Sequence, residues 1–328
     1  MVTSLEANRF PVKTVINPDA QEETQSSLMI RDYYKSLHAR AVVFMDKDDT
    51  TIHMEVGEPT DPRLEEVIKE AQKKGVVASY DSDSSYVDLE GWLGMRGLSI
   101  AERGGLVRFP DGREVHLVRS GDWFKELIAR FAERLIEEKE LKDTTAVLHL
   151  DPWPFLFADT HIPGQHNQLV MVNTGRKVSA SFVTGLLDQV QGGKIVRHTP
   201  ESARFHQEMA AILLEERDRL ASERPFPDPE GMVDDVNHES ELVIVKSAGA
   251  SKQRAMGYLS WVLKPLGIPV YHIGDNPVSD NMTEIPGVVT MAVGNGGLKD
   301  CPGVIAASQP MASGVVELFE NHIIPDLK

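Results

Sequence analysis

The sequence predicts an α/β protein, in which a parallel sheet has helices on both faces and a segment of mixed α+β structure is inserted. Residues 41–46 form an apolar run that ends in an acid, as expected of a central parallel strand buried on both faces. A helix pattern over 62–74 leads to a short apolar strand at 76–79, which implies parallel pairing through a right-handed crossover. A buried strand at 270–273 repeats the pattern, so α/β structure is expected at both ends of the chain.

The composition is that of an ordinary globular protein. The 328 residues are 26% charged and 41% hydrophobic, which allows two domains and a sizeable core. A formal net charge of −16 argues against nucleic acid and an anionic membrane as partners. Cys301 is the only cysteine, which excludes an intrachain disulfide and a Cys-based zinc site and fits a reducing compartment. No apolar run approaches the roughly 18 residues of a membrane span and no signal peptide pattern opens the chain, so we expect a cytoplasmic protein.

The first part of the chain supplies an arm and one half of the predicted core. Residues 1–37 are predicted to form an N-terminal arm with a short helix near its end. In the helix after the first strand, Asp61 can cap the N-terminus, Pro62 suits the first turn and Gly75 ends it. The tripeptide at 110–112, Pro-Asp-Gly, predicts a hairpin between two short strands.

The inserted segment is placed at 118–245, which leaves 38–117 and 246–328 as the two halves of the core. Within the insertion, helices are expected at 122–139, 178–190 and 200–222, and strands at 145–150, 169–173 and 194–198. The acidic run at 234–241 is interpreted as a solvated loop. At the end of the insertion the pattern predicts a strand at 242–245. After the insertion it predicts a helix capped by Ser251, a last core strand at 289–293 and a closing helix at 315–321.

Acids stand where the first strand ends. Asp46 and Asp48 follow the apolar run directly, and in open α/β sheets ligands bind beyond the carboxyl ends of the strands. Taken alone, the pair could equally be an acidic, solvated turn. Other polar residues at strand ends and helix starts follow downstream, in this order: Ser79, Lys252, Asp275 and Asp280. Together they favour an active site.

The order of these residues, and the elements that carry them, resemble the four motifs of the haloacid-dehalogenase-like phosphotransferases. The resemblance covers roughly 38–115 and 246–328. It implies a Rossmannoid core, a cap domain inserted between the second and third motifs as in the sugar-phosphatase branch, and phosphoryl transfer, which needs an in-line nucleophile and charge neutralisation.

The resemblance also implies a role for each matched residue. Asp46 would be the nucleophile that forms an aspartyl-phosphate. Asp48 would protonate the leaving oxygen and later activate water. Thr50 and Ser79 would donate hydrogen bonds to the phosphoryl group, and Lys252 would hold that group together with the Asp46 carboxylate.

Magnesium is the implied cofactor, because two anions must approach each other and Mg2+ prefers oxygen ligands in octahedral geometry. Asp46, the backbone carbonyl of Asp48 and Asp275 would ligate it. Asp280 would orient the metal-bound waters or Lys252, with assistance from Asn276 or Ser279.

Four residues depart from the usual motifs. Asp49 stands where many relatives have glycine, Tyr80 and Asp81 follow Ser79 in place of Gly-Arg, and Gln253 replaces the glycine that commonly follows the lysine. None of these changes removes a catalytic group. The alternative for Lys252 itself is an exposed lysine at a helix start, where the helix dipole disfavours a cation.

The insertion would select the substrate. Residues 88–94, 101–108 and 136–139 are similar to stretches of trehalose-6-phosphate phosphatases, although Arg103 stands where those enzymes usually have histidine. The resemblance therefore implies a Mg2+-dependent phosphatase of a small phosphorylated metabolite, a sugar phosphate. The alternatives are a phosphomutase of the phosphomannomutase type and a catalytically silent metabolite-binding protein. No feature of the sequence indicates the oligomeric state.

Two further groups of side chains in the insertion are interpreted as structural. Histidines at 149, 161 and 166 are interpreted as loop residues, since their spacing fits no closed zinc site. The aromatic residues between 153 and 157 are interpreted as anchors of a loop in the core, the alternative being stacking on a sugar ring.

Overall fold

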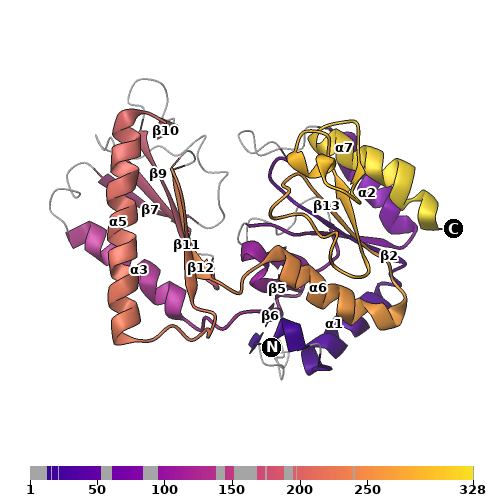
Figure 1. Cartoon of the computed structure of the whole chain (residues 1–328), viewed down its shortest axis with the longest axis horizontal. Coiled ribbons are helices and arrows are strands. Elements are labelled where there is room, and N and C mark those ends of the chain that lie inside the picture. Colours follow the sequence, from indigo (N-terminus) through magenta and orange to yellow (C-terminus); the bar gives the residue numbers. More distant parts are fainter. Residues whose placement is uncertain are drawn as a thin grey trace, which may run out of the picture.

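The computed structural model places the chain in two lobes that lie side by side (Figure 1). It describes residues 13–15, 17–20, 22–52, 61–83, 95–137, 145–150, 168–173, 176–187, 195–196, 198–238 and 241–327. Among these residues, no helix is long and apolar enough to cross a membrane. The histidines at 161 and 166, the aromatic residues of 153–157 and the segments 88–94 and 138–139 lie outside the described residues.

The first lobe is built on a parallel sheet, which confirms the predicted fold class. Its strands run in the order β15-β14-β13-β2-β3 and every pair is parallel. The bounds are Ala41–Met45 for β2, Val76–Tyr80 for β3, Val270–Gly274 for β13, Val288–Ala292 for β14 and Ile305–Ala306 for β15. Because β2 and β13 are neighbours and parallel, the acids that follow them meet at one edge of the sheet.

Helices cover both faces of this sheet (Figure 1). One face packs against α2 (Arg63–Lys73) and α7 (Met311–Leu318), and the other packs against α1 (Gln25–Ser36) and α6 (Lys252–Leu263). In α2 the buried residues recur at helical spacing, as the sequence predicts, and they are Leu64, Val67, Ile68 and Ala71.

The prediction of a separate N-terminal arm is wrong for the part of 1–37 that the structure describes. Ile30 and Tyr34 of α1 are fully buried in the core against α6. The short strand β1 (Lys13–Val15) pairs in parallel with β6 (Glu114–His116). The error arose because α1 shows only a weak apolar stripe, so its burial depends on contacts from distant parts of the chain.

A second, smaller sheet extends this lobe in the order β1-β6-β5-β4. Strands β4 (Ser99–Ala101) and β5 (Leu106–Arg108) are antiparallel, and so are β5 and β6. The predicted hairpin turn is present between β5 and β6, where Gly112 has a φ of 90° that favours glycine.

The second lobe contains most of the insertion. Its sheet runs β11-β12-β9-β8-β7, with β10 beside β9. One face packs against α3 (Trp123–Glu137) and α5 (Pro200–Glu223) around a separate apolar core. The strand bounds are Thr145–Leu150 for β7, Gln168–Asn173 for β8, Ser179–Leu187 for β9, Ile195–Val196 for β10, Met232–Asn237 for β11 and Leu242–Ser247 for β12.

The helix predicted at 178–190 is wrong over the residues that the structure describes, because Ser179–Leu187 forms β9, a strand between β8 and β12. Ala180 and Phe182 alternate onto the face that packs in the apolar core with α3 and α5. Val178, Phe182 and Leu186 are four residues apart, so the same sequence also fits a helical period. Tertiary pairing decides between the two patterns.

The acidic run at 234–241 is not a solvated loop throughout, because Met232–Asn237 forms the edge strand β11. Asp234 forms an ion pair with Arg217 of α5, and Asp235 lies 2.6 Å from Arg103 of the first lobe. Charged side chains are common on edge strands, where they prevent pairing with other chains. The acidic residues therefore made this strand resemble a loop in the sequence.

The turn at 102–104 of the first lobe contacts the second lobe. Glu102, Arg103 and Gly104 all have positive φ, at 52°, 57° and 85°. The buried Glu102 carboxylate accepts hydrogen bonds from the backbone N–H groups of Lys177 and Val178 at 2.7 and 2.8 Å. A Cβ on Gly104 would lie 2.2 Å from the backbone oxygen of Ser251, so only glycine fits beside the start of α6.

Candidate active site

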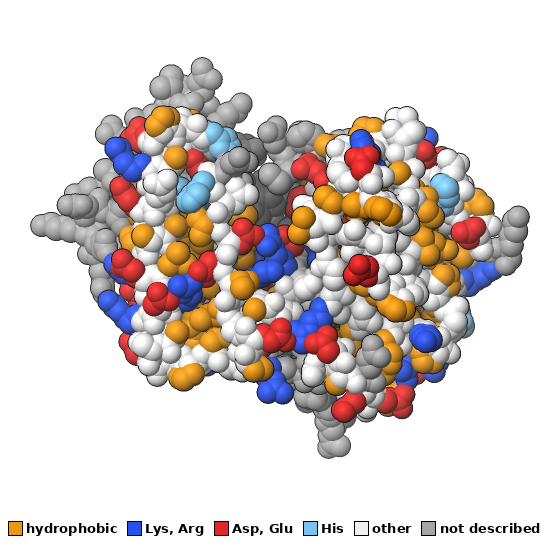
Figure 2. All heavy atoms as spheres, viewed as in Figure 1, with side chains coloured by type: hydrophobic (Ala, Val, Ile, Leu, Met, Phe, Trp, Pro, Cys, Tyr) orange, Lys and Arg blue, Asp and Glu red, His pale blue; other side chains and the backbone are white. Residues whose placement is uncertain are grey.

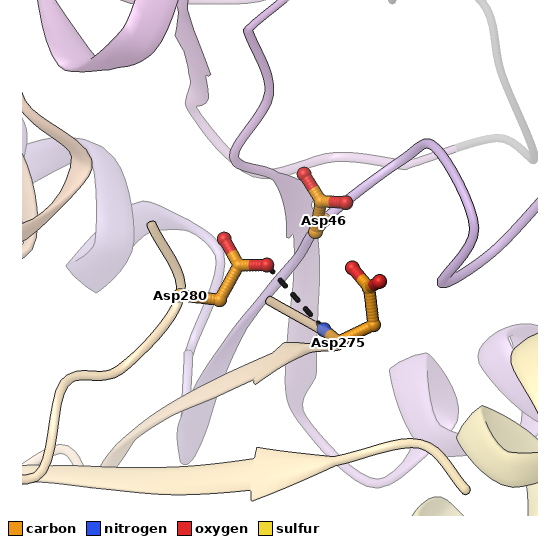
Figure 3. Close-up of side chains that lie close together, drawn as sticks. All are labelled: Asp46, Asp275 and Asp280. Atoms are coloured by element: carbon orange, nitrogen blue, oxygen red, sulfur yellow. Dashed lines mark hydrogen bonds between the residues drawn. The ribbon is translucent and has the colours of Figure 1, made fainter. Parts of the chain in front are cut away.

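Three carboxylates converge at the edge of the parallel sheet (Figure 3). Asp46 follows β2, Asp275 follows β13, and Asp280 comes from the loop after Asp275. One oxygen from each of the three lies within 4.8 Å of the others. Parallel strands that end together thus place side chains from distant parts of the chain in one cluster, as expected.

Lys252 reaches this cluster from the first turn of α6. Ser251 caps the helix by accepting a hydrogen bond from the N–H of Arg254, so Lys252 is the first helical residue. Its Nζ lies 2.5 Å from Asp46 Oδ1 and 2.9 Å from Asp280 Oδ1. Only 4% of the Lys252 side chain is exposed, which contradicts the alternative of a solvated lysine.

Asp280 supports the loop that carries Asp275. Its Oδ2 accepts hydrogen bonds from the backbone N–H groups of Asp275 and Asn276 at 3.3 and 3.1 Å. Its Oδ1 accepts from Lys252 and from the Ser279 hydroxyl, the latter at 3.2 Å. Both oxygens are therefore engaged, which leaves Asp46 and Asp275 as the carboxylates best placed to ligate a cation.

Asn276 and Ser279 lie in the same loop without entering the cluster themselves. Asn276 Oδ1 accepts hydrogen bonds from the N–H groups of Val278 and Ser279 at 2.8 and 3.3 Å. The side chain thus closes a local turn, as asparagine commonly does. In this structure both residues shape the loop, and a direct role in catalysis stays a prediction.

The segment after β2 holds the remaining predicted residues. Thr50 is buried and its hydroxyl donates a hydrogen bond to Asp275 Oδ1 at 3.3 Å. The Asp48 side chain is 34% exposed and lies 3.8 Å from Lys47 Nζ. Asp49 has a φ of 58°, in the left-handed region that favours glycine but tolerates aspartate. This explains why glycine is common at that position and why Asp49 is accommodated.

Ser79 is not brought to the carboxylates. It pairs with Phe44 in the sheet, two residues before Asp46, and it is 1% exposed. A Cβ on Gly97 would lie 1.6 Å from its hydroxyl, so the side chain is enclosed within the core. The chain reaches the level of Asp46 only at Asp81, whose N–H donates to the Met45 carbonyl at 2.9 Å. A phosphate-binding role for Ser79 stays a prediction.

Two buried groups near the cluster were missed from the sequence. Lys47 is 1% exposed although it lies between two acids. His272 of β13 and Asp81 are both fully buried, with Nε2 and Oδ2 separated by 3.2 Å. A charged or polar residue within an otherwise apolar strand was the available signal for His272, since such residues need a partner when buried.

Comparison with known proteins identifies the fold. No family model matches the sequence, and no curated protein matches it. A solved structure from Thermoplasma acidophilum aligns with 89% of this chain and 100% of its own, at a TM-score of 0.50 and 15% identity. A haloacid dehalogenase-like hydrolase from Bacteroides thetaiotaomicron aligns with 85% of this chain and 98% of its own, at a TM-score of 0.50 and 14% identity. The chain has the haloacid-dehalogenase-like fold.

The haloacid-dehalogenase-like fold was the expectation from the motifs, and it is confirmed at the level of the fold. The trehalose-6-phosphate phosphatase of Aspergillus fumigatus is also similar, with a TM-score of 0.42, 15% identity, and coverage of 90% of this chain and 97% of its own. That likeness is too distant to bear on the substrate.

The carboxylates of this site are crowded and short of positive charge. Burial raises the pKa of Asp46 well above its usual range; Lys252 opposes this rise, while Asp280 and Asp48 add to it. Burial raises the pKa of Asp275 to about 6, and the neighbouring Asp280 raises it further. Burial alone would raise the pKa of Asp280, but Lys252 and His272 lower it.

This arrangement fits a divalent cation. Carboxylate oxygens are the ligands that Mg2+ prefers, and a bound cation offsets the repulsion between neighbouring acids. Asp46 and Asp275 would hold the ion, with Thr50 orienting Asp275 through its hydroxyl. The residues present therefore fit the predicted cofactor.

Binding of Mg2+ is expected to strengthen as the pH rises through about 6. The folded-state pKa of Asp275 is raised to about 6, so below that pH its carboxyl group is protonated and cannot ligate a cation. The increase in unfolding temperature on adding Mg2+ should be small at about pH 5 and larger at about pH 7.5. An increase that is equal at both pH values, or that persists in Asp275→Asn, would contradict this assignment.

Proposed function

We propose that this protein is a Mg2+-dependent phosphatase that hydrolyses a small phosphorylated metabolite, a sugar phosphate, through a phosphoenzyme at Asp46. The observation that carries the proposal is the buried contact of Lys252 with both Asp46 and Asp280, in a cluster that includes Asp275. A buried lysine that joins two acids at a strand edge suits charge neutralisation during phosphoryl transfer. The haloacid-dehalogenase-like fold agrees with it.

In the proposed reaction, Asp46 Oδ2 attacks the phosphorus atom while Lys252 holds Oδ1 and the incoming phosphoryl oxygens. The bond from phosphorus to the leaving oxygen breaks, and Asp48 gives that oxygen a proton. Asp48 then removes a proton from water, which attacks the phosphorus and releases phosphate and free Asp46. When bound, Mg2+ supplies positive charge to the phosphoryl oxygens.

The environment of Asp48 supports its proposed role as the acid and base. Burial raises the pKa of Asp48, although Lys47 and Lys252 partly oppose the shift. A carboxyl group with a raised pKa holds its proton closer to neutral pH, which suits proton transfer. Its side chain is 34% exposed, so water can reach it.

The second lobe is proposed to select the substrate. Figure 2 shows the surface hollowed between the lobes, with Lys and Arg side chains beside Asp and Glu side chains. Arg103 connects the two lobes, since its guanidinium lies 2.7 Å from Asp83 of the first lobe and 2.6 Å from Asp235 of the second. Paired charges of this kind offer both donors and acceptors to hydroxyl groups, which supports a sugar as the leaving group.

A screen for phosphate release across sugar, polyol, glycerate and nucleotide phosphates tests the proposal. Release of phosphate from a sugar phosphate would support it. Conversion to an isomeric phosphate without release would instead indicate a phosphomutase. A rise in the unfolding temperature of the protein on adding a sugar phosphate that is not itself converted would indicate a binding protein.

Removal of divalent cations is expected to stop the reaction. Without Mg2+, repulsion between the phosphoryl group and the Asp46 and Asp275 carboxylates is no longer offset. Phosphate release should fall at least about a hundredfold in EDTA and recover when Mg2+ is added in excess. An unchanged rate in EDTA would contradict the cofactor assignment.

A further inference from the structure

Gln253 connects the start of α6 to the loop at 275–280. Gln253 follows Lys252 directly, in the first turn of α6. Its Nε2 donates to the backbone carbonyl of Val278 at 2.7 Å and to that of Ser279 at 2.9 Å. The Ser251 hydroxyl donates to Gln253 Oε1 at 2.8 Å. The two contacts of Nε2 join α6 to the loop at 275–280, and the contact of Oε1 lies at the start of the helix.

These partners fix the orientation of the amide group. An amide nitrogen has two hydrogens, and each has a carbonyl acceptor here. The opposite orientation would set Oε1 against two carbonyl oxygens and would leave the Ser251 hydroxyl facing a donor. The chemistry of the partners therefore decides the assignment. A glycine at 253 could make none of these contacts.

The loop held by Gln253 is the one that positions the acids. Inside the loop, Asp280 accepts hydrogen bonds from the N–H groups of Asp275 and Asn276. On its outer side, Val278 is 82% exposed, and its carbonyl meets the Gln253 amide. On the inner side, Lys252 Nζ donates a hydrogen bond to Asp280 Oδ1 at 2.9 Å. The consecutive residues Lys252 and Gln253 therefore contact the inner and outer sides of the same loop.

We propose that Gln253 is a positioning residue for the metal site: its amide holds the loop at 275–280 against α6 so that Asp275 is fixed beside Asp46. The inference rests on the proposed function, because it assumes that Mg2+ binds to these carboxylates. A ligand that is held in place loses less conformational freedom when the cation binds, and outer residues of this kind often set metal affinity. Binding of the phosphorylated substrate need not be affected.

The test compares wild type with Gln253→Met, which keeps the side-chain length but removes both donors. Mg2+ binding is measured by isothermal titration calorimetry and by the Mg2+-dependent rise in unfolding temperature. We expect Gln253→Met to bind Mg2+ about tenfold more weakly. Its kcat at saturating Mg2+ should stay within about threefold of wild type, while the Mg2+ concentration for half-maximal activity rises by the same factor as the dissociation constant.

Gln207→Met provides the matched control, since Gln207 is exposed on α5 of the other lobe. If Gln253→Met folds poorly, Gln253→Ala tests the same contacts, because alanine suits a helix. Mg2+ affinity in the Gln253 variant that equals that of wild type within about twofold would overturn the inference. Failure of wild type itself to bind Mg2+ would overturn the proposed function, and the two failures are therefore distinguishable.

Discussion

Asp46→Asn is expected to abolish phosphate release while leaving the fold intact. An amide cannot replace a carboxylate as the nucleophile, so no phosphoenzyme can form, and activity should fall by at least about 10⁴-fold. Asparagine has the same shape as aspartate, and its Oδ1 can still accept the hydrogen bond from Lys252, so the variant should fold. Phosphate release and the unfolding temperature are the two measurements.

Asp49→Asn is the matched control for this substitution. Asp49 lies three residues further on in the same segment, it has no proposed catalytic role, and asparagine is favoured at its φ of 58°. This variant should keep most of the activity. Appreciable turnover by Asp46→Asn, at more than about one per cent of wild type, would remove Asp46 as the nucleophile.

The core sheet could be predicted because its signals are local. Strands β2 and β13 are short, mostly apolar runs that end in acids. Such runs are typical of parallel strands that are buried on both faces of a sheet. The ends of parallel neighbours must then meet, so the proximity of Asp46 and Asp275 followed without any knowledge of their contacts. Lys252 was expected there only through the resemblance.

The failures have a different physical origin, because they depend on register and on partners elsewhere in the chain. The sequence from 178 to 187 satisfies both a helical and a strand period, and pairing with β8 and β12 makes Ser179–Leu187 a strand. Register also decides which residue after β3 lies level with Asp46, and here it is Asp81; the phosphate-binding role of Ser79 stays a prediction. A shift of two residues along a strand moves a side chain by roughly 7 Å.

Buried charges such as Lys47 and the Asp81–His272 pair could not be read from the sequence for a related reason. The Asp81–His272 pair joins residues that are far apart in the chain, and although the partner of Lys47 is the adjacent Asp48, only the fold shows that the lysine is buried. Composition assigns such residues to the surface, where they are most often found. Clusters of buried charged residues commonly occur at functional sites, where they lower the stability of the fold.

Lys252→Met is expected to lower both stability and activity, because it leaves two buried carboxylates without their cation. Lys252 Nζ lies 2.5 Å from Asp46 and 2.9 Å from Asp280. Burial alone would lower the pKa of Lys252, but the two acids raise it well above its usual value. Removing one partner of a buried ion pair costs about 3–5 kcal/mol of unfolding free energy, and removing a group that stabilises transferring charge costs about 10²–10³ in kcat.

The stability loss of Lys252→Met should depend on pH, with a sign that separates this contact from simple packing. Wild-type Lys252 keeps its charge below its raised folded pKa, so its contribution is present throughout the neutral range. In the variant, Asp46 and Asp280 bind protons more tightly when folded than when unfolded, so stability falls as the pH rises. Urea unfolding should therefore give a larger difference from wild type at about pH 8 than at about pH 5. Lys264→Met, at an exposed position after α6, should differ little at either pH, and a Lys252→Met loss independent of pH would show that the side chain serves packing alone.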